Sequence, residues 1–133
     1  MKKDIPFHKV EDIAIAVIPD EITEDEMWKV YLINMKPEPI TNVIITSKGY
    51  GHVEGRPVET SVMRQFFETI DGRSYSLIEP IDSKLFGLSN EFWVSFVQEG
   101  VMYDKKYVFV TESIVKDNFT SIPLMDTKGV MIK

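Results

Sequence analysis

Apolar residues alternate with polar ones along several short stretches of this chain, and turn-forming residues bound each stretch. A period of two is typical of β-strands, because successive side chains of a strand point to opposite faces of the sheet. The pattern predicts strands at 12–18, 27–34, 42–47, 74–81, 91–97 and 101–110, with a shorter one at 129–133. A single helical turn is expected within 111–119, starting near Thr111 or Ser113. The sequence therefore predicts an all-β protein.

One segment, 57–70, has two interpretations. Its apolar residues recur four apart, as along one stripe of a helix, at Val58, Val62, Phe66 and Ile70. It is also rich in strand-favouring residue types, and the Asp71-Gly72 dipeptide that follows suits a type I′ hairpin turn. We predict a strand here. The alternative is an α+β fold with a helix at 58–70.

Length and composition suit one folded unit. With 133 residues, 44% of them hydrophobic, the chain can bury one core, and we predict a single domain over 1–133. The chain contains no cysteine, which excludes disulfides and thiolate metal sites. The succession of strands, the turn spacing and the long final hairpin resemble an immunoglobulin-like β-sandwich of about seven to nine strands. Because the Cys…Trp…Cys signature is absent, this resemblance is architectural and implies no function.

Charge and hydropathy limit the partners. Charged residues interrupt the first dozen positions, and the longest compact apolar run, at 13–19, is far shorter than a membrane span. We therefore expect a cytoplasmic protein that does not enter a membrane. The net charge of −6 repels nucleic-acid phosphates, so nucleic acid is not an expected partner. The acidic run at 20–26 lacks the ligand spacing of a calcium loop and is expected to be a solvated hairpin tip.

The glycine-rich stretch KGYGHVEG, at 48–55, follows a predicted strand, where phosphate-binding loops occur. A dinucleotide fingerprint would require a third glycine where Glu54 stands. A Walker loop would require Lys-Ser/Thr after its last glycine, but Arg56-Pro57 follows Gly55. We therefore predict a hairpin or bulge loop whose glycines permit positive φ, and no bound cofactor.

Alternate residues of the same stretch form a candidate binding face. In an extended conformation Tyr50, His52, Glu54 and Arg56 would lie on one side of the chain, where they could bind a small polar ligand or a partner. Only His8 and His52 could serve as a histidine base, and His8 lies near the terminus, so a hydrolase-type enzyme would use His52. With two histidines far apart in the sequence, no metal site is predicted.

The strand at 91–97 carries the other candidate residue. Its even positions, Phe92, Val94 and Phe96, are predicted to be core, whereas Trp93 shares the opposite face with Ser95. That face is either a second buried face at a sheet centre or an exposed one that places Trp93 at an interface.

Three functional classes follow. The expected one is a non-catalytic interaction module that binds another protein or itself, with a homodimer favoured because an open sandwich leaves unpaired strand edges. The first alternative is a small-ligand domain that uses the Tyr50–Arg56 face. The second is a small hydrolase-type enzyme with His52 as its base.

Overall fold

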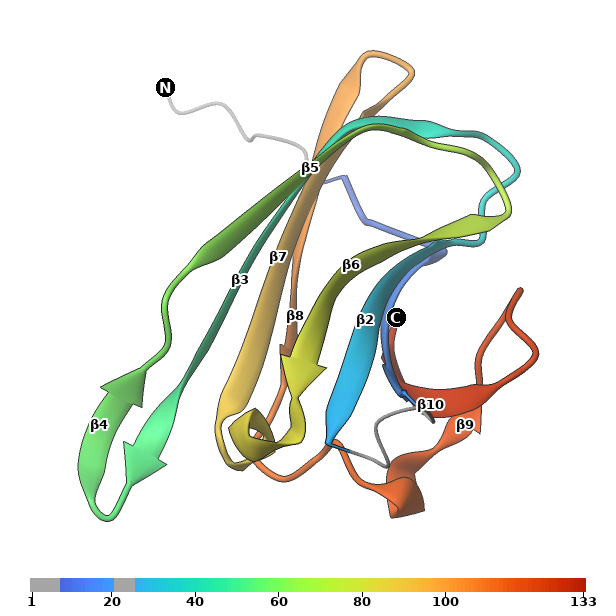
Figure 1. Ribbon diagram of the computed structural model, residues 1–133. Coiled ribbons are helices and arrows are strands. Elements are labelled where there is room, and N and C mark those ends of the chain that lie inside the picture. Colours follow the sequence, from blue (N-terminus) through green and yellow to red (C-terminus); the bar gives the residue numbers. More distant parts are fainter. Residues whose placement is uncertain (1–7, 21–25) are drawn as a thin grey trace, which may run out of the picture.

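The computed structural model describes residues 8–20 and 26–133, and within them the fold is an antiparallel β-sandwich (Figure 1). One layer, the β1 sheet, has the order β6-β2-β1-β10-β9. Its strands are β1 (Ile13–Pro19), β2 (Met27–Asn34), β6 (Ser74–Asp82), β9 (Thr120–Ser121) and β10 (Lys128–Ile132). The all-β prediction is confirmed.

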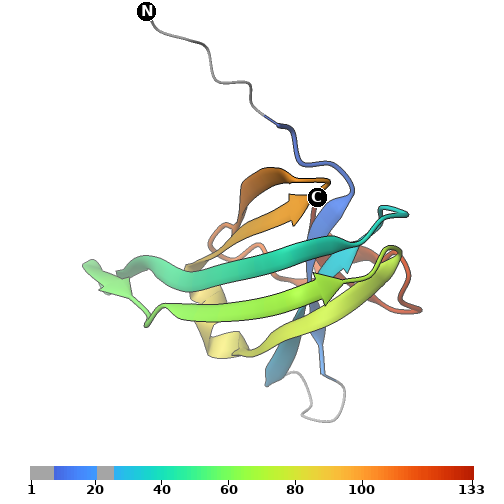
Figure 2. The ribbon, with the colours of Figure 1, turned by 90° about the horizontal axis from the view of Figure 1, so that it is seen from above.

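The other layer, the β3 sheet, has the order β4-β3-β7-β8, and β5 pairs with β3 as well. Its strands are β3 (Ile40–Val53), β4 (Arg56–Glu59), β5 (Met63–Ile70), β7 (Ser89–Gln98) and β8 (Val101–Phe109). The long β3 pairs with β7 along one edge, and its other edge pairs first with β5 and then with β4. Figure 2 shows β3 and β5 running side by side across the sandwich.

The core lies between the two sheets. Phe92 and Phe96 of β7 are buried in it, as the alternation predicts, and so are Tyr107 and Phe109 of β8. The Tyr107 hydroxyl donates a hydrogen bond of 2.7 Å to the carbonyl of Ile13 and thereby joins the two sheets. Burial raises the pKa of Tyr107, so the hydroxyl keeps the proton that it donates.

A second, smaller cluster covers the outer face of the β1 sheet. Ala14 and Ala16 of β1 are fully buried there beside Ile33 of β2, and Ile122 packs against them. The chain that follows β9 folds back in a tight turn, in which the Ile122 amide donates to the carbonyl of Thr127 at 3.0 Å. Both faces of β1 are therefore buried, which explains its nearly continuous apolar sequence.

The structure decides between the two interpretations of 57–70 and tests the predictions for the segments that follow. Residues 57–70 are extended as predicted, and the helix at 58–70 is wrong, but they form two strands, β4 and β5, separated at 60–62, and not the single predicted strand. The hairpin predicted at 91–110 is confirmed as β7 and β8, with Glu99 and Gly100 at φ of 50° and 74° in the turn. The region 111–119 does contain a helical turn, η3 (Lys116–Asn118), but it begins later than the predicted start near Thr111 or Ser113. The short helix η2 (Ser83–Gly87) was not predicted.

The predicted hairpin turn at Asp71-Gly72 is wrong, because β5 and β6 belong to different sheets. Gly72 instead lies against the other inter-sheet connection: a Cβ on Gly72 would stand 2.1 Å from the carbonyl oxygen of Pro37. The Arg73 amide donates to the carbonyl of Lys36 at 2.8 Å. The two crossovers, 35–39 and 71–73, therefore run side by side.

The glycine-rich stretch is mostly strand rather than loop. β3 continues to Val53, and the hairpin to β4 turns at Glu54 and Gly55, whose φ values are 51° and 77°. The predicted hairpin is thus present, with a turn of two residues in place of a loop over the whole stretch.

The acidic run lies at a second hairpin. It joins β1 to β2, and the Asp20 amide donates to the carbonyl of Met27; residues 21–25 lie outside the described residues. Neither described helix has the length and apolar character of a membrane span.

Candidate functional site

The four residues predicted to share a face lie at the hairpin of β3 and β4, which projects from the sandwich at the lower left of Figure 1. His52 pairs with Pro57, and Val53 pairs with Arg56. Antiparallel partners share a face of the sheet, so Arg56 lies on the face opposite to Tyr50 and His52. Glu54 is in the turn. The chain reverses direction inside the stretch, and the predicted common face therefore does not form.

His52 lies exposed near the hairpin tip, outside the cavity described below. Within 8–20 and 26–133, no ion pair or side-chain hydrogen bond engages its imidazole. A histidine base is oriented by a second group in the Ser-His-Asp arrangement. The described residues place no such group against His52.

Tyr50 instead joins Trp93 in one polar network on the outer face of the β3 sheet. The Tyr50 hydroxyl donates to Glu91 Oε1 at 3.3 Å, and Lys106 Nζ lies 3.9 Å from the same oxygen. Lys106 Nζ also lies 4.9 Å from the centroid of the Trp93 ring, and the indole N–H donates to Asp104 Oδ2 at 3.3 Å. Two residues that the sequence singled out separately are thus connected through Glu91 and Lys106.

The network raises the pKa of Tyr50 and orients the Trp93 ring. Partial burial, and then the charge and hydrogen bond of Glu91, raise the pKa of the Tyr50 hydroxyl above its ordinary value. Glu91 itself is buried, although it points to the outer face of the sheet. The ammonium of Lys106 over the indole adds a cation–π contact.

We call the surface around this network the Trp93 face. It consists of three cross-strand rows: Arg64, Thr46, Trp93 and Lys106; Phe66, Ile44, Ser95 and Asp104; and Lys48, Glu91 and Val108. Trp93 is 46% exposed, so the interpretation that places it on an exposed face is the correct one. Ile44 and Phe66 are exposed beside it. A shallow hollow of about 240 Å³ opens between Ile44, Thr46, Trp93, Ser95 and Asp104.

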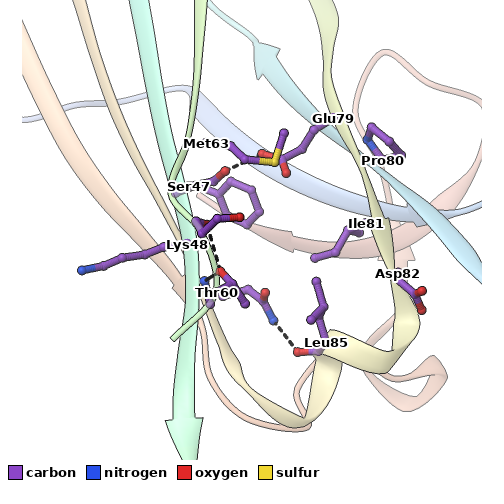
Figure 3. Close-up of a pocket in the computed structure, with 13 residues that line it drawn as sticks. Ser47, Lys48, Thr60, Met63, Glu79, Pro80, Ile81, Asp82 and Leu85 are labelled. Atoms are coloured by element: carbon purple, nitrogen blue, oxygen red, sulfur yellow. Dashed lines mark hydrogen bonds between the residues drawn. The ribbon is translucent and has the colours of Figure 1, made fainter. Parts of the chain in front are cut away.

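A second candidate site, the inter-sheet cavity, lies where β3 and β6 face each other across the sandwich (Figure 3). Its volume is about 140 Å³. The apolar side of the lining includes Met63, Pro80, Ile81, Leu85 and Phe92, and the polar side includes Ser47, Thr60, Glu79 and Asn90. Figure 3 shows the Glu79 side chain directed toward Ser47 and Met63.

A β-bulge places Glu79 in this cavity. Val30 pairs with Glu79 and Tyr31 with Leu77, so Ile78 is an extra residue in β6. Glu79 therefore shares the inner face with the buried Val30, and Ser47 Oγ donates to its Oε1 at 2.5 Å. Burial raises the pKa of the Glu79 carboxyl, and the hydrogen bond from Ser47 opposes that rise.

Glu79→Gln is expected to stabilise the protein near neutral pH. The unfolded chain ionises Glu79 at its ordinary pKa and the folded chain at a higher one. At pH values between these two pKa values, the unfolded state therefore binds fewer protons than the folded state. The free energy of unfolding then falls as the pH rises through the pKa of Glu79 in the folded protein. Glutamine has no ionisable carboxyl and therefore removes this pH-dependent loss of stability. We expect the resulting gain in the free energy of unfolding to be less than about 1 kcal/mol, because Glu79 is partly solvated.

Urea unfolding at about pH 7 and about pH 4 measures this difference, since both states are largely protonated at the lower pH. Glu68→Gln, an exposed glutamate of β5, is the matched control and should leave stability within about 0.5 kcal/mol. A Glu79→Gln variant less stable than the wild type near neutral pH would contradict the expectation.

Glu79 was not among the predicted site residues. Its only signal in the sequence is an acidic residue between Ile78 and Ile81 of a predicted strand, and the bulge that turns it inward has no signature there.

The cavity also gives a role to Gly49 of the glycine-rich stretch. A Cβ on Gly49 would lie 3.1 Å from Thr60 Cγ2 and 3.3 Å from Asn90 Oδ1, so the glycine keeps this space open.

The fold and these sites define an antiparallel β-sandwich with one exposed aromatic face and one small inter-sheet cavity. In the part of the chain that the structure describes, no group of three or more His, Asp or Glu side chains is placed to hold a metal ion. Comparisons with protein-family models, curated proteins and solved structures found no match. Function is therefore inferred from the geometry.

Proposed function

We propose that this protein is a non-catalytic cytoplasmic interaction module that binds a second copy of itself through the Trp93 face. The observation that carries the proposal is the exposed aromatic and aliphatic group of Ile44, Phe66 and Trp93 around a hollow. Exposed apolar groups of this kind, surrounded by polar residues, mark interaction sites. Tryptophan is also among the residues that contribute most to binding energy at interfaces.

We further propose an immunoglobulin-like arrangement of the strands. β1, β2 and β6 share one sheet, while β3, β5, β7 and β8 belong to the other, in which β4 pairs with the end of β3 beyond β5. This distribution corresponds to strands A, B and E against C′, C, F and G of immunoglobulin-type sandwiches. The β9–β10 pair then extends the first sheet beyond strand A. Sandwiches of this kind serve widely as interaction domains, which supports the proposal by analogy only.

Charge favours a second copy as the occupant. The Trp93 face carries three cations, Lys48, Arg64 and Lys106, and two acids, Glu91 and Asp104, which gives a net charge of +1. The whole chain has a net charge of −6. Two copies that meet through this face can place the cations of one copy opposite the acids of the other, while the excess negative charge of each chain lies away from the interface. In a two-fold dimer the same patch is used twice, so each hollow can receive an exposed side chain of the other copy.

Trp93→Ala is expected to dissociate the dimer. In a two-fold interface the ring is lost twice, and about 2 kcal/mol per ring raises the dissociation constant roughly several hundredfold. Sedimentation at micromolar concentration should show the wild type at twice the 15.3 kDa of one chain and the variant at 15.3 kDa. The variant should keep its fold, because Trp93 is exposed.

Leu77→Ala provides the control. Leu77 is 47% exposed, close to the 46% of Trp93, but it lies on the β1 sheet. Its replacement should leave the dimer intact. A wild type that sediments as a single chain at every concentration would refute the proposal, and so would equal dissociation by both variants.

A further inference from the structure

We propose that the inter-sheet cavity is a binding site for a small primary amine with an apolar body, and that Glu79 anchors its ammonium group. The site lies between the sheets, whereas the Trp93 face lies outside the β3 sheet, so this proposal does not depend on self-association.

The cavity presents hydrogen-bond acceptors that lack donors. Glu79 Oε1 accepts from Ser47, but among the described residues no group donates to Glu79 Oε2. The Asn90 amide nitrogen donates to the carbonyls of Leu85 and Leu88, at 3.0 and 3.2 Å, and these bonds orient the side chain. No donor among the described residues reaches Asn90 Oδ1. An ammonium group has three donors and no acceptor, which suits such a lining.

The surrounding charges leave Glu79 available to a cation. No described lysine or arginine forms an ion pair with it. Lys48 of β3 points away from the cavity in Figure 3, and Asp82 of β6 turns aside to cap η2, where its Oδ1 accepts from the Lys84 amide at 2.9 Å.

The other nearby charges also lie elsewhere. Glu91 and Arg64 are on the outer face of the β3 sheet, Lys29 pairs with Asp20, and the Lys84 side chain is exposed. The connection at 60–62 carries no charge. A partly buried carboxylate without a cation gains more from an ionic partner than an exposed one, because the surroundings screen the attraction less.

The apolar lining sets the size of the ligand. Met63, Ile81, Leu85 and Phe92 line a space of about 140 Å³. An apolar cavity of roughly 150 Å³ in another protein holds one benzene ring. The chemistry therefore fits one six-membered ring, or an alkyl chain of similar volume, that carries a primary amine. Benzylamine is the corresponding probe.

The test is a titration of isotope-labelled protein followed by amide chemical shifts in an amine-free buffer near neutral pH. Benzylamine should shift the amides of Ser47, Gly49 and Ile81 and should bind at least about tenfold more tightly than benzyl alcohol, its neutral analogue. Benzoate, the anionic analogue, should not bind. The affinity for benzylamine should fall as the pH is lowered through the pKa of Glu79, because the protonated carboxyl carries no charge.

Two variants separate charge from space. Glu79→Gln should reduce benzylamine affinity to that of benzyl alcohol, while Glu68→Gln should leave it unchanged. Gly49→Ala narrows the cavity between Thr60 and Asn90 and should weaken both ligands alike. Benzylamine binding that is equal in the wild type and Glu79→Gln, shifts confined to another surface, or benzoate that binds as well as benzylamine would each overturn the proposal.

Discussion

Asn34→Ala is expected to lower the free energy of unfolding by about 3–5 kcal/mol, because it empties the space of a fully buried side chain and removes three hydrogen bonds to partly buried backbone groups. Asn34 is 0% exposed at the end of β2. Its amide nitrogen donates to the carbonyls of Glu38 and Asp71, both at 3.0 Å, and its Oδ1 accepts from the Lys36 amide at 3.0 Å. One side chain thus joins both crossovers between the sheets.

Chemical denaturation with urea measures this loss as a shift of the midpoint at unchanged slope. Asn118→Ala is the control: Asn118 is exposed, and its amide donates one bond of 2.7 Å to the carbonyl of Ser113. Water can replace that bond, so a loss below about 1 kcal/mol is expected. If both variants lost the same free energy of unfolding, the hydrogen bonds of Asn34 would stabilise the protein no more than the single surface bond of Asn118, and the expectation would be wrong.

Gly72→Ala should destabilise the protein by about 3 kcal/mol or more, because the added methyl group overlaps backbone that cannot move freely. The new Cβ would lie 2.1 Å from the carbonyl oxygen of Pro37 and 2.5 Å from its carbonyl carbon. Pro37 is held nearby by the hydrogen bond from Arg73 to Lys36 and by the Asn34 contacts. Relief of the overlap would separate the two crossovers and break these bonds.

Thermal unfolding of Gly72→Ala and Gly87→Ala provides a matched comparison. A Cβ on Gly87, in η2, would meet no atom within 4 Å, so this substitution should be neutral or slightly stabilising. A Gly72→Ala variant with the melting temperature of the wild type would contradict the close packing of 71–73 against 35–39. Loss of soluble Gly72→Ala protein alongside well-folded Gly87→Ala would agree with it.

Both substitutions act on features that local sequence patterns do not reveal. Asp71-Gly72 after an apolar segment favours a hairpin, because that dipeptide suits a two-residue turn. The same glycine serves a crossover here because Pro37, thirty-five positions earlier, needs the space of its missing side chain. By contrast, Glu99-Gly100 does form the predicted turn, since the strands on either side pair with each other.

The candidate sites also combine features that the sequence predicts with features that depend on strand pairing. The alternation along β7 predicts correctly that Phe92 and Trp93 lie on opposite faces, and the structure selects the exposed interpretation for Trp93. The link from Tyr50 through Glu91 to Lys106 depends on the register of β3, β7 and β8, and single-strand patterns do not specify which residues lie opposite. The face predicted for Tyr50, His52, Glu54 and Arg56 fails because the turn at Glu54 and Gly55 reverses the chain within it.

Local sequence determined most strands of this protein, the inward side of β7 and the hairpin at Glu99 and Gly100, because strand periodicity and turn chemistry act over a few residues. It did not indicate β9 or the break between β4 and β5. Only the tertiary structure decided which sheet each strand joins, how Asn34 and Gly72 hold the crossovers together, and that a bulge at Ile78 turns Glu79 into a cavity. These features depend on contacts between residues far apart in the chain. Their energies come from burial and close packing, which exist only once the two sheets have met.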